Sequence, residues 1–401
     1  MLINGQRALA YTARCGEIMP IEGADNIDLM QVNGWRVIVK KGEFKEGDLC
    51  VYFEIDSKVP EKEWSEFLAS KHYKVKSMKL GKFGVISQGL ALPIDVFDVQ
   101  IPAEENVDVT ELLGVTYAVD EDNVRKARSN KGAKYNAMAA RNKELFKKKP
   151  FRWLMRRQWG RELLFIFFGK KRDNPKAFPT HFPYVKKTDQ ERCENMTWIL
   201  KDKTPFIVTQ KCDGSSGTYI LERKKKLFKD KFEFYVCSRN VRQLNPDQDC
   251  FYEENYYWQA AIKYNIRDKL MDYMLKHPEL TYVCWQGEVC GPAIQKNPHG
   301  LSEIEFFCFH MIDSKIGKYD IRDAKKIWDE YNMVSVPIVS EDYIMPDDFE
   351  EFKLEADGYY DASVCDGQKK KSREGFVYYK TTDPNFSFKN VSRKYLLKHN
   401  L

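Results

Sequence analysis

The 401-residue sequence lacks an apolar run long enough to cross a membrane. The nearest candidate, residues 163–168, stops at Gly169-Lys170, far short of the roughly 18 apolar residues that mark a spanning helix. The N-terminus also lacks the basic segment followed by an apolar core that marks a secretory signal. We therefore expect an intracellular, cytoplasmic protein with no membrane partner.

Paired cysteine motifs are also missing. None of the ten cysteines forms a Cys-x-x-Cys pair or has the spacing of a zinc site, and several lie inside strand-like runs. Reduced thiols are the rule for intracellular proteins, so we expect neither a disulfide framework nor a structural zinc ion.

The composition is that of a globular protein rich in aromatic residues. Hydrophobic residues make up 43%, aromatic residues 14% and charged residues 31%, and the length allows two or three domains. The net charge of +6 is unevenly distributed, because residues 121–160 contain thirteen Lys and Arg but only three Asp and Glu. This segment, with a local net charge of +10, leaves the rest of the chain slightly acidic.

Residues 1–115 contain short strand-like runs at close intervals. Residues 27–32 and 35–39 flank Asn33-Gly34, a strong signal for a two-residue hairpin turn, and further strand-like runs follow within residues 49–93. This spacing predicts a small OB-like β-barrel, a fold that commonly binds nucleic acid. A barrel that only packs against the neighbouring domain is the alternative.

Residues 116–180 form a basic connector. We expect a helix over residues 126–148, interrupted by Pro150, followed by a stretch, Phe151–Trp159, that combines arginines with two tryptophans. Such a segment can bind phosphates and stack on bases. It can equally be a solvated face whose tryptophans pack between domains, with a membrane-surface helix a more distant alternative.

The segment Thr209–Ser216 holds the most informative lysine. Residues 206–208 predict a buried strand, and Lys211 stands at its end, two residues before Asp213 and a glycine turn. A lysine attacks only as the neutral amine, so its ordinary pKa of about 10.4 has to fall by roughly three units near neutrality, through burial, other cations or a bound metal. An ordinary turn with a solvated lysine is the alternative.

Further polar residues lie at strand ends in the second half of the chain, as expected of an α+β domain with a site built on sheets. One amphipathic helix is predicted over residues 252–275. Taken singly, each polar residue has an ordinary explanation as a surface charge or a turn, and Phe309 as core. The strand-end segments are Ser238-Arg239-Asn240, Gly287-Glu288, Phe306–Phe309, Glu374-Gly375 and Lys389.

In this order, the segments resemble the motif series of the covalent nucleotidyltransferases, whose first motif is Lys-x-Asp-Gly. The stretch Gly287–Lys296 looks like the Gly-Glu-x-x-Gly-Pro-x-Ile-Gln segment of the ATP-dependent RNA ligases. Residues 187–195 and 387–392 resemble the branch with an OB domain ahead of the catalytic domain. The resemblance implies an antiparallel-sheet, ATP-grasp-like nucleotidyltransferase domain over residues 181–401. Ser387 departs from relatives that have a lysine there, which leaves Lys389 alone or assisted by Lys394.

The resemblance implies ATP, a lysyl-AMP intermediate on Lys211, and Mg²⁺ or Mn²⁺. It further implies an RNA substrate at nicks or breaks in a duplex, and we expect a monomer without a protein partner. The implied nucleotide-binding residues are Gln210, Asp213, Gly214, Arg239, Glu288, Phe309, Glu374, Lys389, Lys187 and Arg192, and the implied metal ligands are Asp213, Glu288, Glu374 and Asn240.

Three other functions remain open. A DNA ligase has the same chemistry and differs in a few contacts to the sugar. A non-catalytic nucleic-acid-binding protein with a ligase-like fold would be expected to have lost some of the motif residues, and Lys211, Glu288, Glu374 and Lys389 are all present. A guanylyltransferase would carry a barrel after the fifth motif, for which the 12 residues after Lys389 leave no room.

Overall fold

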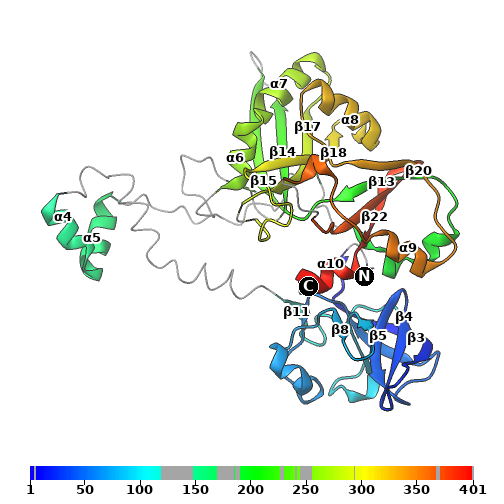
Figure 1. Cartoon of the computed structure of the whole chain (residues 1–401). Coiled ribbons are helices and arrows are strands. Elements are labelled where there is room, and N and C mark those ends of the chain that lie inside the picture. The colour runs from blue at the N-terminus through cyan, green and yellow to red at the C-terminus, as the bar shows by residue number, and fades with distance from the viewer. Residues whose placement is uncertain are drawn as a thin grey trace. The chain divides into compact units, whose positions relative to one another are not determined.

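The computed structural model describes residues 1–3, 6–118, 148–168, 185, 190–225, 230–239, 242–243, 255–292, 294–366 and 371–399. The chain divides into two compact units (Figure 1). The larger contains Met1–Ala118, Pro179–Gln243 and Glu254–Leu401, and the smaller contains Val119–Phe178 and Leu244–Glu253.

The N-terminal domain is built on a five-stranded antiparallel sheet in the order β10-β6-β3-β4-β5. The predicted hairpin is confirmed: Val32 pairs with Trp35, and Asn33 has the positive φ, 53°, that a two-residue turn requires. Alternate residues of the strands fill one apolar core. The elements are β1 (Leu2–Ile3), β2 (Gln6–Arg7), β3 (Ala10–Pro20), β4 (Ile27–Val32), β5 (Trp35–Lys40), β6 (Leu49–Phe53), β7 (Ser57–Lys58), η1 (Glu63–Lys71), β8 (Met78–Leu80), β9 (Val85–Ser87), β10 (Leu90–Pro93), η2 (Ile94–Val96) and β11 (Thr116–Tyr117).

A polar contact joins this domain to the start of the C-terminal domain within the larger unit. The side-chain oxygen of Asn195 accepts hydrogen bonds from the Tyr11 hydroxyl (3.1 Å) and from the Trp35 indole N–H (2.7 Å). The Arg192 guanidinium is buried and pairs with Asp56 at 3.2 Å. Since paired and hydrogen-bonded groups avoid most of the cost of burial, these polar groups can be buried where the two domains meet.

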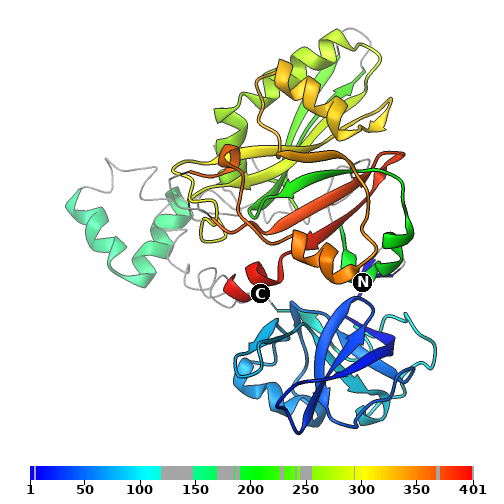
Figure 2. The same ribbon diagram turned by 45° about the vertical axis from the view of Figure 1, so that its right-hand side comes forward.

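The C-terminal domain contains two sheets, five-stranded β12-β22-β21-β13-β20 and six-stranded β16-β15-β14-β17-β18-β19. Helices α6, α7 and α8 pack against the six-stranded sheet, as both views show (Figures 1 and 2). The elements are β12 (Glu191–Arg192), η4 (Cys193–Asn195), η5 (Thr197–Lys201), β13 (Phe206–Lys211), β14 (Ser215–Lys224), β15 (Lys231–Ser238), β16 (Arg242–Gln243), α6 (Tyr256–Lys263), α7 (Ile266–Lys276), β17 (Tyr282–Cys290), β18 (Glu305–Asp313), β19 (Gly317–Lys318), α8 (Ile321–Glu330), β20 (Ile338–Tyr343), α9 (Phe349–Glu355), η6 (Ala362–Val364), β21 (Gly375–Lys380), β22 (Asp383–Val391) and α10 (Arg393–His399).

The single helix predicted over residues 252–275 is wrong in one respect. The segment forms two helices, α6 and α7, because Asn265 adopts a left-handed conformation with a φ of 49°. Asparagine tolerates this conformation better than most residues, so the chain can leave the helix at Asn265. The apolar periodicity continues on both sides of this interruption, which is why the sequence pattern predicts one helix.

The described part of the connector is a helical hairpin of α4 (Lys149–Met155) and α5 (Gln158–Phe168). Pro150 lies in the first turn of α4, where its missing N–H costs no helical hydrogen bond. The helix predicted over residues 126–148 falls outside the described residues, apart from Lys148. No helix in the described part of the chain combines the length and apolarity needed to span a membrane, and the nine described cysteines are free thiols.

Candidate active site

A cavity of about 280 Å³ is lined by residues from both sheets of the C-terminal domain. Strands β13 and β17 carry residues of the first and third motifs, β14 supplies Ser215 and Ser216, and β18, β21 and β22 supply aromatic and basic residues. Among the predicted site residues, the lining includes Gln210, Lys211, Asp213, Gly214, Arg239, Glu288, Phe309 and Lys389. The structure therefore brings together most of a set that is dispersed over 180 residues of sequence.

Lys211 contacts the predicted acidic residue of the fourth motif. Strand β13 pairs with β21 so that Lys211 faces Gly375, and the Lys211 ammonium donates a 2.7 Å hydrogen bond to Oε2 of Glu374. The Lys211 side chain retains only 23% of its exposure. Strand pairing thus brings the two motifs together, and no flexible loop has to do so.

Burial alone does not give Lys211 the lowered pKa that a nucleophilic amine requires. Burial does lower the pKa, but the carboxylates of Glu374, Glu288 and Asp213 outweigh it and raise the pKa above its ordinary value. Without nucleotide and metal, Lys211 is therefore a protonated ammonium. Lys211 therefore has to lose its proton before it can react. Cations that bind beside it favour this loss, and a neighbouring carboxylate can accept the proton.

Two of the surrounding carboxyl groups are hard to ionise. Burial, followed by repulsion from Glu374, raises the pKa of Asp213 to about 7. Burial also raises the pKa of Glu288 to about 8, with Lys211 opposing the shift. Three carboxyl groups near one ammonium favour the uptake of further positive charge.

The acidic residues fit a metal ion only in part. Oxygen ligands suit Mg²⁺ and Mn²⁺, yet the described residues include no group of three or more His, Cys, Asp or Glu side chains arranged to hold a metal. The ammonium of Lys211 interacts with all three carboxyl groups instead. The site therefore fits a cation shared with substrate phosphates and water, and does not contain a complete protein cage.

Gly214 is required by close packing between the first and third motifs. A Cβ atom at this position would lie 2.4 Å from the carbonyl oxygen of Val289 and 2.9 Å from Cγ of Glu288. Only glycine lets the turn after Lys211 approach β17 this closely.

We predict that Gly214→Ala lowers the free energy of unfolding by about 1–3 kcal/mol and slows nucleotide transfer to Lys211 at least tenfold, because β17 has to move. Chemical unfolding and the rate of protein labelling by a nucleotide would measure the two effects. Gly81→Ala is the matched control, since its Cβ would meet nothing within 4 Å. Labelling of Gly214→Ala at the wild-type rate would contradict the packing argument.

Two residues that the sequence analysis missed hold the loop carrying Asp213. The backbone N–H of Asp213 donates to Nε2 of His299 (3.1 Å), while Nδ1 of His299 donates to the carbonyl oxygen of Val364 (2.7 Å). The Tyr395 hydroxyl donates to Oδ2 of Asp213. Burial lowers the pKa of His299 to about 4, which keeps the ring neutral and able to accept. Neither residue lies in a recognisable motif, so no signal in a single sequence identifies them.

Aromatic and amide side chains line another part of the cavity. Phe309 is partly buried there, with Tyr379 and Val336 also in the lining. The Gln210 amide is held at both ends, since Oε1 accepts from the N–H of Asp361 (2.9 Å) and Nε2 donates to the carbonyl oxygen of Tyr359 (3.3 Å). These contacts fix the orientation of Gln210 in the wall.

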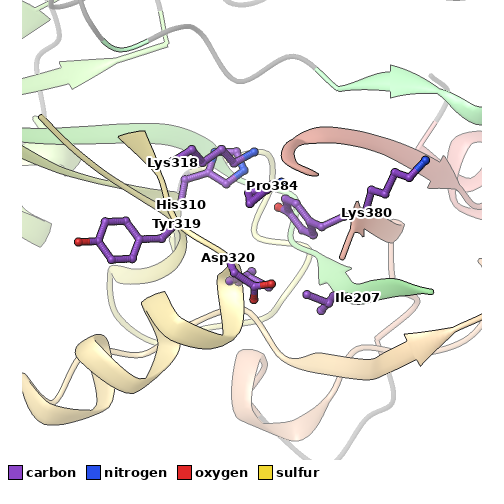
Figure 3. A pocket seen from close by; sticks show the side chains of 9 residues that line it. Ile207, His310, Lys318, Tyr319, Asp320, Lys380 and Pro384 are labelled. Atoms are coloured by element: carbon purple, nitrogen blue, oxygen red, sulfur yellow. The ribbon is translucent and has the colours of Figure 1, made fainter. Parts of the chain in front are cut away.

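A much smaller crevice, of about 10 Å³, shares Tyr379 with the large cavity. His310 and Lys318 lie close together there, while Tyr319 and Lys380 point to either side (Figure 3). Lys318 Nζ lies 5.2 Å from the centre of the Tyr379 ring. The crevice has room for a single water molecule and none for a nucleotide, so the large cavity is the candidate substrate site.

Some predicted residues are not brought to the cavity. Arg192, one of the implied nucleotide-binding residues, does not line the cavity and is instead buried against Asp56, 5.8 Å from the Trp35 ring centre. Lys394, considered as a helper of Lys389, pairs with Asp357 at 3.0 Å. Lys187 and Asn240 lie outside the described residues.

Comparisons with known proteins agree with this architecture. Residues 9–94 match an OB-fold domain family and residues 204–396 match the RNA ligase family. No curated protein sequence matches the chain.

Solved structures of Naegleria gruberi RNA ligase resemble the whole chain. An apo mutant is 27% identical, with a TM-score of 0.71 and 98% of each chain covered. A mutant with ATP and Mn is 27% identical (TM-score 0.70, 98% of each chain), and a form with PPi is also 27% identical (TM-score 0.69, 98% of this chain and 99% of that one). The chain belongs to the RNA ligases that carry an OB-fold domain ahead of the catalytic domain.

Proposed function

We propose that this RNA ligase uses ATP to join a 3′-hydroxyl to a 5′-phosphate at nicks or breaks in duplex RNA, as an RNA repair enzyme. The observation that carries the proposal is the position of Lys211, whose Nζ lies 2.7 Å from Glu374 in a cavity shared with Asp213 and Glu288. The Naegleria ligase structures with ATP and Mn, and with AMP and Mn, support ATP and a divalent metal as its cofactors.

In the first step, Lys211 Nζ forms a bond to the α-phosphorus of ATP as the bond to pyrophosphate breaks. The resting ammonium has to lose a proton first, and Oε2 of Glu374 is a hydrogen-bonded acceptor for it. Lys389 and Arg239 line the cavity and neutralise phosphate charge, while Phe309 stacks on the adenine ring.

In the second step, AMP moves from Lys211 to the RNA 5′-phosphate, breaking the phosphorus–nitrogen bond and returning the amine. The 3′-hydroxyl then attacks that activated phosphate and releases AMP. Asp213, Glu288 and Glu374 would hold the metal ion together with the phosphates, and the metal supplies charge neutralisation in these steps. Positioning and electrostatic stabilisation account for most of the rate enhancement.

The proposal is tested by incubating the enzyme with each of the four α-labelled nucleoside triphosphates and then with nicked duplexes. ATP is expected to label the protein through an alkali-stable bond, and the label is expected to pass to a nick with a ribose 3′ end. Transfer and sealing only at a deoxyribose end would make the protein a DNA ligase in function. No label from any nucleotide would overturn the proposal.

We predict that Lys389→Ala slows enzyme labelling by ATP about 10²–10³-fold, because a cation facing the phosphates is lost. Labelling rates at saturating ATP measure the effect, and Lys225→Ala, at an exposed lysine after β14, is the matched control. An unchanged rate in Lys389→Ala would remove Lys389 from phosphate binding.

A further inference from the structure

The helical hairpin α4/α5 lies outside both regions matched by family models, residues 9–94 and 204–396. Its inner face is a small apolar core in which Leu164 is buried against Phe151, Leu154 and Phe168. Gly160 lets the helices meet, since a Cβ there would lie 2.3 Å from the carbonyl oxygen of Leu154. The hairpin is therefore a packed element with its own small core.

Two indole rings and an arginine form a cluster on its outer surface. Trp153 and Trp159 pack edge to face, with ring centres 5.9 Å apart, and stay 50% and 54% exposed. The Arg157 guanidinium lies 4.4 Å from the centre of the Trp153 ring. A large aromatic surface left half exposed marks an interaction site more often than a stabilising contact.

The charge around this cluster favours a polyanion. Lys148, Arg156 and Arg157 are exposed at the ends of α4, and residues 121–160 as a whole carry a net charge of +10. Bases stack on indole and guanidinium planes in proteins that bind single-stranded nucleic acid, while neighbouring cations follow the phosphates. The combination of stacking surface and positive charge suits a nucleic acid strand.

We propose that Trp153, Trp159 and Arg157 form a docking platform for an unpaired segment of the RNA substrate, such as a frayed end or an overhang. The inference rests on the proposed function, because RNA is the polyanion that this ligase acts on. The platform captures the strand by stacking and by charge.

A second outward feature defines the competing explanation. On α5, Leu163, Ile166 and Phe167 follow Trp159 at helical spacing, and Ile166 and Phe167 are the most exposed of the four. Such an apolar stripe suits a lipid surface or an apolar protein surface better than RNA. Substitutions on the two features separate the explanations.

The test measures binding of a fluorescently labelled 12-nucleotide RNA, single-stranded or in a blunt duplex, to the full chain at several salt concentrations. Trp153→Ala/Trp159→Ala is expected to weaken single-strand binding at least tenfold, with a smaller effect on the duplex, because stacking is lost. Arg157→Gln is expected to weaken binding and lower its salt dependence, since a phosphate contact is removed. Ile166→Ser/Phe167→Ser is the matched control and is expected to bind RNA like the wild type.

Enzyme labelling by ATP, which needs no RNA, is measured on the same preparations. Absence of label in the wild type would count against the proposed function, whereas labelled tryptophan variants with wild-type RNA affinity would overturn the platform alone. A large fall in melting temperature in those variants would identify internal packing and overturn it as well. Cosedimentation with phosphatidylserine vesicles that Ile166→Ser/Phe167→Ser abolishes, with RNA affinity unchanged in the tryptophan variants, would assign the hairpin to a membrane surface instead.

Discussion

Replacing Lys211 by alanine is expected to abolish labelling of the enzyme by ATP, a loss of more than about 10³-fold. The amine is the group that forms the bond to the α-phosphorus, and it lies in the cavity with a hydrogen bond to Oε2 of Glu374. Lys211→Arg should lose labelling equally, because a guanidinium keeps the charge but stays protonated. The alkali-stable protein label from α-labelled ATP measures the effect.

The sealing step, in which the 3′-hydroxyl attacks the AMP-activated 5′-phosphate, serves as a control for the same variants. Joining of an RNA whose 5′ end already carries AMP does not require a new bond to Lys211, so Lys211→Ala should retain a measurable part of this reaction. Retention would show that the cavity is intact and that the lysine acts as nucleophile in the first step. Wild-type labelling of Lys211→Ala, with the label mapped to another residue, would remove Lys211 from that role.

The sequence predicts the strand framework of this site well, for a physical reason. Lys211 and Glu288 stand in apolar strands whose alternation directs both side chains toward one cavity, and Glu374, just before β21, reaches Lys211 through the pairing of β13 with β21. The hairpin at Asn33 is equally local, since two residues define its turn.

Contacts that depend on tertiary packing were not predictable in the same way. Arg192 follows a family pattern, yet its partner Asp56 is 136 residues away in the other domain. Tyr395 and His299 reach Asp213 from a helix and a loop with no motif of their own. The raised pKa of Lys211 in the absence of nucleotide and metal depends on three carboxyl groups that only the folded sheets bring together, so the sequence alone does not predict it.

Replacing Glu374 by glutamine is expected to slow enzyme labelling by about 10²–10⁴-fold, the usual contribution of a positioned acid or base. The substitution preserves the size of the side chain and its ability to hydrogen-bond Lys211. It removes the carboxylate that lies 2.7 Å from Nζ and can accept the proton of the ammonium.

Glu374→Gln also changes the pKa of Lys211, which opposes the expected loss of activity. The Glu374 carboxylate contributes the largest raising effect on the pKa of Lys211, so Glu374→Gln lowers that pKa and increases the neutral amine at a given pH. If Glu374 acted only as a counter-charge, the variant would label as fast as the wild type or faster. If it accepts the proton and helps hold the metal, the defect persists when the pH rises from 7 to 9, where a merely protonated amine would recover. Labelling rates measured from pH 7 to 9 decide whether Glu374 only changes the pKa of Lys211 or takes part in the transfer. Glu341→Gln, at an exposed position, is the control.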